Sequence, residues 1–287
     1  MKTAMKILSK DSISNFMETL DFDILGISYL NEDSIKRSPR VIMNNYKILV
    51  MLQGSAGIHM GRNVYYTKQG DCVLFAPGSL YHAEIMGEER CQFLSINFSF
   101  PTAAQQKSFS DTLALKDVAI YPGIISELSL NTFHYVMNEA IEEREGHYLS
   151  VLLLLQRLVA LAIYNGQNNI LKNDVKLFSD SEEKLVMQCH SYVINNPSHA
   201  VTVEDLCNIC NVSQSYLYKS FKSVLDMSCK EFITSTKLEM ASRALMQTDK
   251  SIGQIALENG FSNGYRFSNI FKKKYGLSPS AYRKLGK

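Results

Sequence analysis

The sequence predicts an α+β protein of two domains: an antiparallel β-barrel with associated helices, then an all-α domain with two helix-turn-helix units. Three observations carry this prediction. Residues 22–100 alternate short apolar runs with turn residues, apolar spacing becomes helical after Pro122, and one helix–turn–helix pattern occurs twice after residue 200. With 287 residues, 46% of them hydrophobic and 20% charged, the chain has the composition of a packed protein with room for two domains.

Charge is divided unevenly along the chain. Residues 1–180 hold 16 Lys and Arg against 19 Asp and Glu, a net charge of −3, whereas residues 181–287 hold 14 against 9, a net charge of +5. An acidic first part joined to a basic second part fits a sensor attached to a nucleic-acid-binding module. A basic solvated surface would fit the same numbers.

The six cysteines are too few for a disulfide scaffold, and the first ten residues lack the apolar core of a signal peptide. The most apolar stretch, residues 151–163, contains Gln156 and Arg157 and is shorter than the ~20 residues of a membrane span. We therefore expect a reduced, cytoplasmic protein with no membrane partner.

Short strands are expected first, each ended by Gly or Pro. The expected strands are 46–52, 64–67, 72–76, 82–86 and 92–98. Glycines at 54, 57, 61, 70, 78 and 87 are assigned to turns. This spacing is typical of an antiparallel sandwich or small barrel.

Two helices should follow, one containing Leu128, Val136 and Ala140 and one over 148–164. The second is apolar nearly all round, which fits either burial of both faces within one chain or a dimer interface. The polar, Asn-rich segment after it is expected to be a linker, so the domains are placed at 1–165 and 181–287, with the linker at 166–180.

The first helix-turn-helix unit is predicted between Val203 and Lys222. A short helix over 203–210 is closed by Asn211, which tolerates the left-handed conformation, and Ser213 caps the next helix. In that helix Leu217, Phe221 and Val224 form the buried stripe, and the residues left outward are polar or basic, as in a recognition helix.

The pattern returns about fifty residues later. A helix over 251–258 is followed by an Asn259-Gly260 turn, Ser262 is expected to cap the next helix, and Phe267, Ile270 and Phe271 point inward. A long helix over 231–247 is expected to hold the two units at a fixed separation. Recognition helices ~34 Å apart would reach successive major grooves.

Residues 185–285 resemble the DNA-binding domain of AraC/XylS-family regulators. The resemblance rests on Ser251-Ile252, Ile255-Ala256, Gly260-Phe261-Ser262, Phe267-Ser268, Phe271-Lys272-Lys273, Gly276, Ser278-Pro279 and Tyr282-Arg283, with a second set at Leu206, Ser213, Tyr216-Leu217, Phe221-Lys222, Ser228 and 237–241. The chain departs from the family pattern at four positions. Asp226 and Cys229 replace Gly and Pro, Arg266 replaces an aromatic residue, and Asn269 replaces a basic one.

The outward side chains are assigned roles by their chemistry. Arg and Asn can make paired hydrogen bonds to guanine and adenine, whereas Lys is suited to phosphates. The expected base-contacting residues are Ser215, Tyr218, Lys219, Tyr265, Arg266 and Asn269, and the expected phosphate-contacting residues are Lys222, Lys272 and Lys273.

Residues 20–100 resemble the cupin-like sensor domain of many such regulators, through Gly54, Gly57, Gly70-Asp71, Pro77-Gly78 and His82. The resemblance implies a small effector, drawn in relatives from sugars, fatty acids, bicarbonate, urea or aromatic acids. Candidate effector-binding residues are His59, His82, Arg37, Arg40, Arg62 and Arg90. Each of the two histidines fits a structural role as well.

No metal, cofactor or catalytic residue is expected. A metal cupin needs a His-x-His pair with further ligands, and the sequence contains no His-x-His. The Cys207-x-x-Cys210 pair is assigned to packing, because it lies in one short helix without a second ligand pair nearby in the sequence.

The resemblance implies a dimeric regulator that binds double-stranded promoter DNA, responds to a small-molecule effector, and activates transcription through RNA polymerase. Activation is a tendency of the family and not a feature of the residues. Two alternatives stay open: a ligand-independent dimeric regulator, and a metal-dependent cupin enzyme fused to a DNA-binding module.

Overall fold

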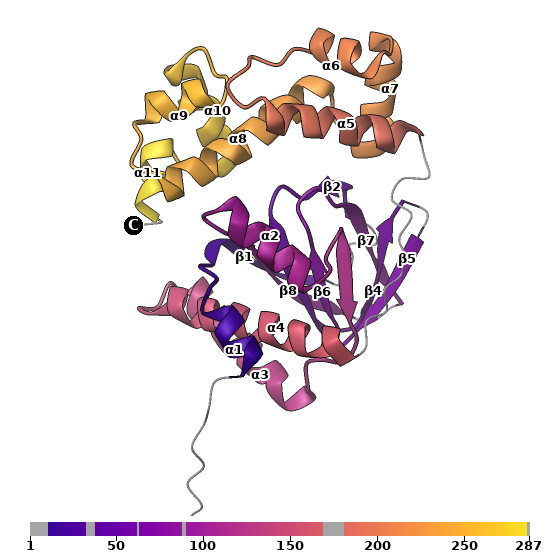
Figure 1. Ribbon diagram of the computed structural model, residues 1–287, viewed down its shortest axis with the longest axis vertical. Helices are drawn as coiled ribbons and strands as arrows, with labels where there is room; N and C mark the ends of the chain where they lie inside the picture. Colours follow the sequence, from indigo (N-terminus) through magenta and orange to yellow (C-terminus); the bar gives the residue numbers. More distant parts are fainter. Residues whose placement is uncertain (1–10, 33–37, 62, 88–89, 169–180, 286–287) are drawn as a thin grey trace, which may run out of the picture.

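The computed structural model describes residues 11–32, 38–61, 63–87, 90–168 and 181–285. A β-rich N-terminal domain carries helices on one side, and a helical C-terminal domain lies across its opposite end (Figure 1). The expected α+β architecture is confirmed at this level.

The first sheet of the N-terminal domain is antiparallel throughout. Its strands, in spatial order, are β1 (Asp23–Glu32), β8 (Cys91–Ser99), β3 (Tyr46–Gln53), β6 (Cys72–Phe75) and β9 (Val118–Tyr121). Alternate side chains of β3 pack into two different apolar cores. Ile48 and Val50 face the helices, whereas Leu49 and Met51 face the second sheet.

The second sheet is also antiparallel and packs against the first. Its strands are β2 (Val41–Ile42), β7 (Leu80–Met86), β4 (Ser55–Met60) and β5 (Asn63–Lys68). The space between the sheets is filled by apolar side chains, among them Ile58, Phe75 and Tyr81. Phe75 and Tyr81 stack with ring centroids 4.2 Å apart.

All five expected strands are confirmed to within two residues at either end. β4 was not expected, because its glycines suggested turns. Gly57 lies inside β4 and, unlike Gly54, Gly61, Gly70, Gly78 and Gly87, does not have a positive φ. The turn assignment of Gly57 is therefore wrong.

The helices described in the N-terminal domain are α1 (Ser12–Met17), α2 (Ala103–Thr112), α3 (Glu127–Ile141) and α4 (His147–Asn168). They cover the outer face of the first sheet, where Phe98, Phe100 and Phe109 pack around Tyr46. α4 continues past residue 165 into the stretch expected to be linker.

α4 is longer than expected and passes a length-and-composition test for a membrane span, with a mean hydropathy of 1.6 over His147–Gly166. Leu155, Leu158 and Val159 on its inner face are fully buried in the domain core. Burial of this face in the domain core explains why α4 is apolar, so its composition does not require a membrane.

The helices described in the C-terminal domain are α5 (Ser181–Asn195), α6 (Val203–Cys210), α7 (Gln214–Leu225), α8 (Cys229–Gln247), α9 (Ile252–Glu258), α10 (Gly264–Tyr275) and α11 (Pro279–Leu285). α8 crosses from one half of the domain to the other (Figure 1). Its first part packs in one apolar cluster, with α5, α6 and α7, and its last part packs in another, with α9 and α10.

Candidate nucleic-acid interface

The first helix-turn-helix unit consists of α6 and α7. Asn211 ends α6 at φ 51° and ψ 50°, and the Ser213 hydroxyl accepts a hydrogen bond from the Tyr216 amide at the start of α7. Both features confirm the sequence-based assignment. They set the tight turn that fixes α7 relative to α6.

The inner face of α7 holds the unit together. Leu217 and Phe221 are fully buried, and Val224 is nearly so. Phe221 packs against Phe232 of α8 with ring centroids 4.9 Å apart. Because this stripe is buried, the side chains on the other face of α7 must point to solvent.

The second unit consists of α9 and α10. Gly260 makes the turn at φ 71°, where a Cβ atom would come within 2.6 Å of the His199 carbonyl oxygen. The cap of α10 is Asn263, whose Oδ1 atom accepts hydrogen bonds from the Tyr265 and Arg266 amides. The assignment of this cap to Ser262 is therefore wrong by one residue.

The inner face of α10 is aromatic. Phe267 and Phe271 are fully buried, and Phe271 also contacts the rings of Tyr275 and Tyr282. Ile270, also expected inside, is only partly buried. Since both units present the same kind of inner face, each leaves one exposed face for a partner.

The side chains expected to contact DNA all lie on exposed faces of α7 and α10: Ser215, Tyr218, Lys219 and Lys222 on α7, and Tyr265, Arg266, Asn269, Lys272 and Lys273 on α10. Tyr265 is 77% exposed. A polar face with phenol, amide and guanidinium groups flanked by lysines has the donors and charges that base edges and phosphates require.

Two of the lysines have intramolecular partners. Lys222 pairs with Asp226 at 2.5 Å, which raises the pKa of the lysine, and Lys219 lies 3.7 Å from Glu182. Asp226 ends α7 at φ 55°, the conformation that a glycine favours, so the turn after α7 is kept despite the family departure.

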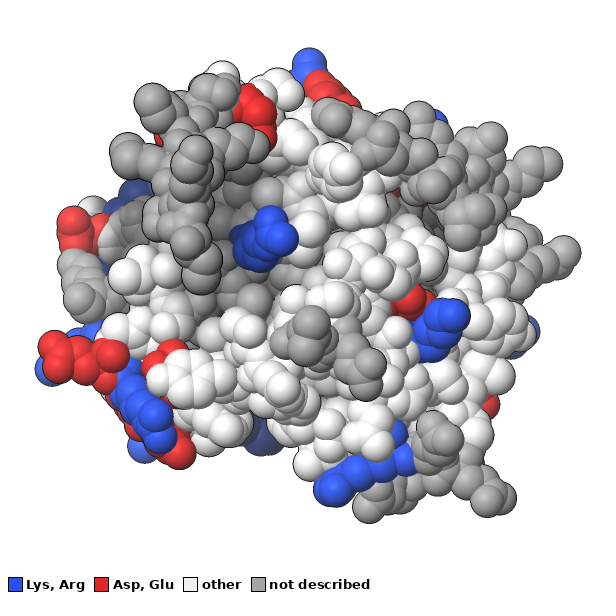
Figure 2. Space-filling view, turned by 90° about the horizontal axis from the view of Figure 1, so that it is seen from below, with Lys and Arg blue, Asp and Glu red and all other residues white. Residues whose placement is uncertain are grey.

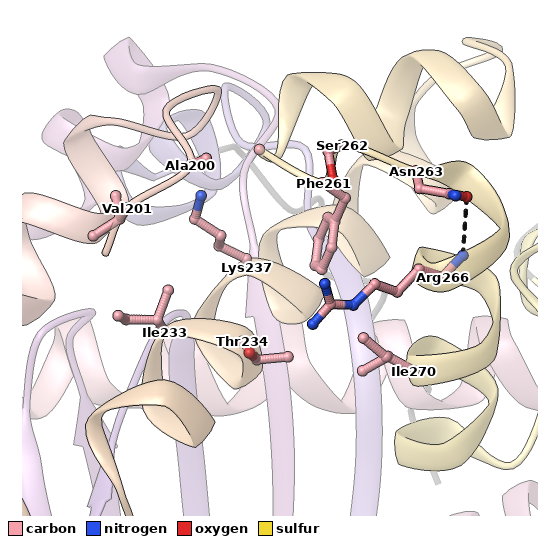
Figure 3. A pocket seen from close by; sticks show the side chains of 11 residues that line it. Ala200, Val201, Ile233, Thr234, Lys237, Phe261, Ser262, Asn263, Arg266 and Ile270 are labelled. Carbon is pink, nitrogen blue, oxygen red and sulfur yellow. Dashed lines mark hydrogen bonds between the residues drawn. The ribbon is translucent and has the colours of Figure 1, made fainter. Parts of the chain in front are cut away.

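A cavity of about 250 Å³ lies between the two units, bounded by α8, the segment before α6, and the start of α10. The side chains of Lys237 and Arg266 point into it (Figure 3). Lys237 is 4% exposed and donates a hydrogen bond to the His199 carbonyl, and burial lowers its pKa. Lys237 therefore ties α8 to the loop before α6.

The residues expected to bind an effector are only partly brought together. His59 and His82 stack with ring centroids 4.4 Å apart, and His59 Nε2 lies 3.2 Å from Glu84. Arg40 pairs with Glu183 of α5 at 3.2 Å, next to these histidines, and the space between them holds no room for a water-sized molecule. Arg90 is exposed at the start of β8.

The other two residues expected to bind an effector, Arg37 and Arg62, lie outside the described residues.

Cysteines that are distant in the sequence meet in the first unit. Cys189 Sγ of α5 lies 3.5 Å from Cys210 Sγ of α6. Burial raises the pKa of both thiols, and the same holds for Cys229. The sequence pattern identified the Cys207–Cys210 pair but not this contact, because it depends on how α5 packs. No group of three or more His, Cys, Asp or Glu suited to a metal ion occurs within the described segments.

Residues 206–285 match the family model described as a helix-turn-helix domain. The raffinose operon transcriptional regulatory protein RafR of Pediococcus pentosaceus is 39% identical over 94 residues, which is 33% of this chain and 34% of RafR. The Msm operon regulatory protein of Streptococcus mutans is 24% identical over 278 residues, covering 95% of this chain and 97% of that protein. This chain thus matches only about a third of the length of RafR.

Among solved structures, ToxT from Vibrio cholerae O395 aligns with a TM-score of 0.44 at 16% identity, covering 91% of this chain and 96% of that one. The two exposed recognition helices, joined by one long helix, define the C-terminal domain as a double helix-turn-helix DNA-binding domain.

Proposed function

We propose that this chain is a sequence-specific DNA-binding transcription regulator whose N-terminal domain controls the C-terminal domain in response to a small effector. The observation that carries the proposal is the pair of exposed helices α7 and α10 on one connecting helix. The connecting helix α8 has 19 residues and is therefore about 28 Å long at 1.5 Å per residue. Two recognition helices joined in this way suit two nearby major-groove sites.

The test is a selection of genomic fragments with the purified full chain at a stated salt concentration, followed by footprinting. We expect a few promoter fragments with protected half-sites one or more helical turns apart. A matched variant, Arg266→Ala with Asn269→Ala, should lose the selection while keeping salt-sensitive binding to unrelated DNA. Binding by the unaltered chain that ignores sequence would contradict the proposal.

We also propose that the chain forms a homodimer through α4. Its outer face exposes apolar side chains at helical spacing: Leu149 is 57% exposed, Leu153 56% and Tyr164 58%. On the side of the N-terminal domain that carries α3 and α4, Lys, Arg, Asp and Glu are scattered between larger areas of uncharged residues (Figure 2). An apolar stripe of this kind suits self-association of two like helices about a twofold axis.

The dimer is tested by light scattering on Leu149→Asp with Leu153→Asp, which should give the monomer mass. Leu257→Asp serves as the control, because Leu257 of α9 is 62% exposed on the other domain and should not affect the mass. A double variant that remains a dimer would place the interface elsewhere.

Activation of RNA polymerase, a cytoplasmic location and the absence of enzyme activity belong to the same proposal. A promoter recovered in the selection should give more transcript with the protein than without it in a purified transcription assay.

Metal analysis of the purified chain tests the alternative of a metal-dependent enzyme. One bound transition metal per chain would favour that alternative. The effector residues His59, His82, Arg40 and Arg90 stay a prediction.

A further inference from the structure

The first side chain of α7 is not among the residues expected to contact DNA. It belongs to Gln214, which directly follows the Ser213 cap and is exposed. Side chains in a helix lean towards its N-terminal end, and that end is the part of a recognition helix that approaches base edges. Gln214 therefore lies where recognition helices contact bases.

Gln214 is held by a residue one turn further along α7. Its Nε2 atom donates a hydrogen bond of 2.6 Å to the hydroxyl of Tyr218, and both residues are exposed. An exposed side chain loses rotational freedom when it binds a partner, and this loss is smaller when the side chain is already held in place. The hydrogen bond to Tyr218 thus orients the Gln214 amide before DNA binds.

The groups of Gln214 that suit adenine take no part in this bond. A side-chain amide has one acceptor oxygen and two N–H donors, and Tyr218 uses only one of the donors. The oxygen and the second N–H form an acceptor beside a donor. Adenine presents the complementary pair, its N6 amino group and N7, in the major groove.

The second unit has no counterpart of this pair. α7 and α10 have 12 residues each and carry a buried Phe at the same place, so Gln214 corresponds to Gly264 and Tyr218 to Ser268. Glycine has no side chain. The Ser268 hydroxyl donates to the Gly264 carbonyl oxygen at 2.9 Å, so it is directed to its own helix.

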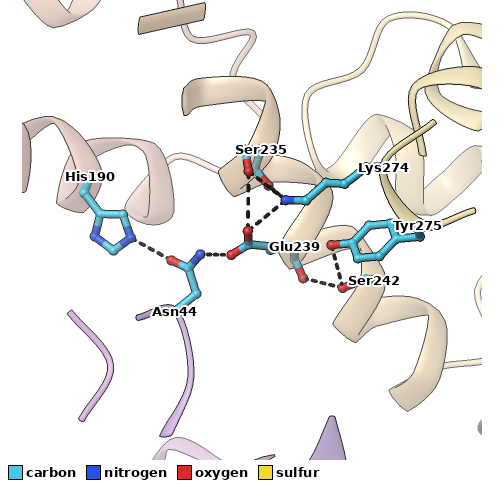
Figure 4. Close-up of polar contacts among 7 residues, drawn as sticks. All are labelled: Asn44, His190, Ser235, Glu239, Ser242, Lys274 and Tyr275. Atoms are coloured by element: carbon cyan, nitrogen blue, oxygen red, sulfur yellow. Dashed lines mark hydrogen bonds and ion pairs between the residues drawn. The ribbon is translucent and has the colours of Figure 1, made fainter. Parts of the chain in front are cut away.

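The end of α10 is also engaged with its own chain. Lys274 donates to the Ser235 hydroxyl at 2.7 Å and pairs with Glu239 of α8 at 2.8 Å (Figure 4). Glu239 in turn accepts a hydrogen bond from Asn44 of the N-terminal domain. The two units therefore offer different groups to DNA, and only α7 begins with an exposed amide.

We propose that Gln214 is a specificity-determining residue that reads one adenine in the half-site of the first unit, and that Tyr218 positions its amide. This role rests on the proposed function, because it requires α7 to enter a major groove. The first half-site then contains a specified position that the second lacks, so the operator is not a simple repeat of one sequence. A pair that only stabilised α7 would leave every base preference unchanged.

The experiment is a selection from randomised double-stranded DNA with the full chain at a stated salt concentration, followed by sequencing. The parent chain should enrich a site of two parts about one helical turn apart. Arg266→Ala marks the part that α10 reads. In Gln214→Ala, the preference for one adenine in the other part should fall by about tenfold, and the remaining positions should keep their preferences.

A second variant tests the role of Tyr218. Tyr218→Phe removes only the hydroxyl that accepts from Gln214, and should weaken the same adenine preference by about two- to tenfold. In the Gln214→Ala background it should have no effect at that adenine, because the amide that it positions is gone. Gln188→Ala is the matched control. It removes an exposed amide of α5 that donates to the Ile209 carbonyl at 3.3 Å, and should leave every base preference unchanged.

All these variants change exposed side chains and should melt as the parent chain does. The proposal is overturned if Gln214→Ala keeps every preference of the parent chain, if the lost preference is for another base, or if Tyr218→Phe acts equally in both backgrounds. A parent chain that enriches no sequence would overturn the regulator as well. Enrichment by the parent chain with an unchanged Gln214→Ala profile would overturn only the role of Gln214.

Discussion

His190 Nε2 donates a hydrogen bond of 2.6 Å to Asn44 Oδ1, and this bond joins α5 of the C-terminal domain to the N-terminal domain. Burial lowers the pKa of His190 to about 4, with Glu239 and Arg243 acting on it in opposite directions. The folded protein therefore keeps this imidazole neutral at a pH where the unfolded chain would protonate it.

This shift predicts a loss of stability in acid. Below pH ~6.5 the unfolded chain binds a proton that the folded chain excludes until the pH nears 4, so the free energy of unfolding should fall as pH falls through this window. Between pH 7 and pH 5 the loss from His190 should be about 2 kcal/mol. Urea denaturation of the parent and of His190→Gln at both pH values measures it. An equal loss in the two proteins would show that His190 does not contribute.

The cap of α10 predicts a difference between neighbouring residues. Asn263→Ala removes the side chain that accepts from the Tyr265 and Arg266 amides, and should lower the free energy of unfolding by about 0.5–2 kcal/mol. Ser262→Ala should have little effect. Thermal melts of both variants test this, and a greater loss at Ser262 would return the cap to that residue.

Arg266 is expected to read a base. Arg266→Ala should cost about 1–3 kcal/mol of specific binding and relax the preference at one base-pair position. Its side chain is exposed and points along the cavity between the units (Figure 3). Competition binding with operators altered at single positions measures the preference. Equal loss on every sequence would exclude base reading.

Lys272 is expected to contact a phosphate. Lys272→Ala should weaken binding to all sequences alike and reduce the slope of log affinity against log salt by about one. Lys107→Ala, on exposed α2 of the other domain, is the matched control and should leave the slope unchanged. The same slope in both variants would show that Lys272 touches no phosphate.

Local chemistry explains how much of this fold the sequence predicts. Asn211, Ser213 and Gly260 act through their own backbone and nearest neighbours, and each is found in its expected role. Gly57 was misassigned to a turn because glycine also occurs inside strands, as it does here in β4. Ser262 was misassigned as the cap of α10 because serine also fits the residue before the cap, which is Asn263. Only hydrogen bonding to the next strand or helix decides between these positions.

Contacts between distant elements could not be predicted in this way. The exposed faces of α7 and α10 follow from helical periodicity, so the residues expected to contact DNA are exposed as the sequence predicts. The hydrogen bond between His190 and Asn44 depends on how the two domains meet, and nothing in the spacing of these two residues in the sequence indicates it. A single sequence carries no direct sign of such a contact.

The carboxylate of Asp226 would compete with a DNA phosphate for Lys222 of α7. It holds Lys222 at 2.5 Å, so a DNA phosphate must displace an acid already attached to the chain. The AraC/XylS-family pattern has glycine at position 226. A glycine there would leave Lys222 without this carboxylate partner and would adopt φ 55° without the steric cost of a Cβ atom. We therefore expect Asp226→Gly to bind DNA somewhat more tightly than the parent chain, by no more than the small free energy of an exposed ion pair.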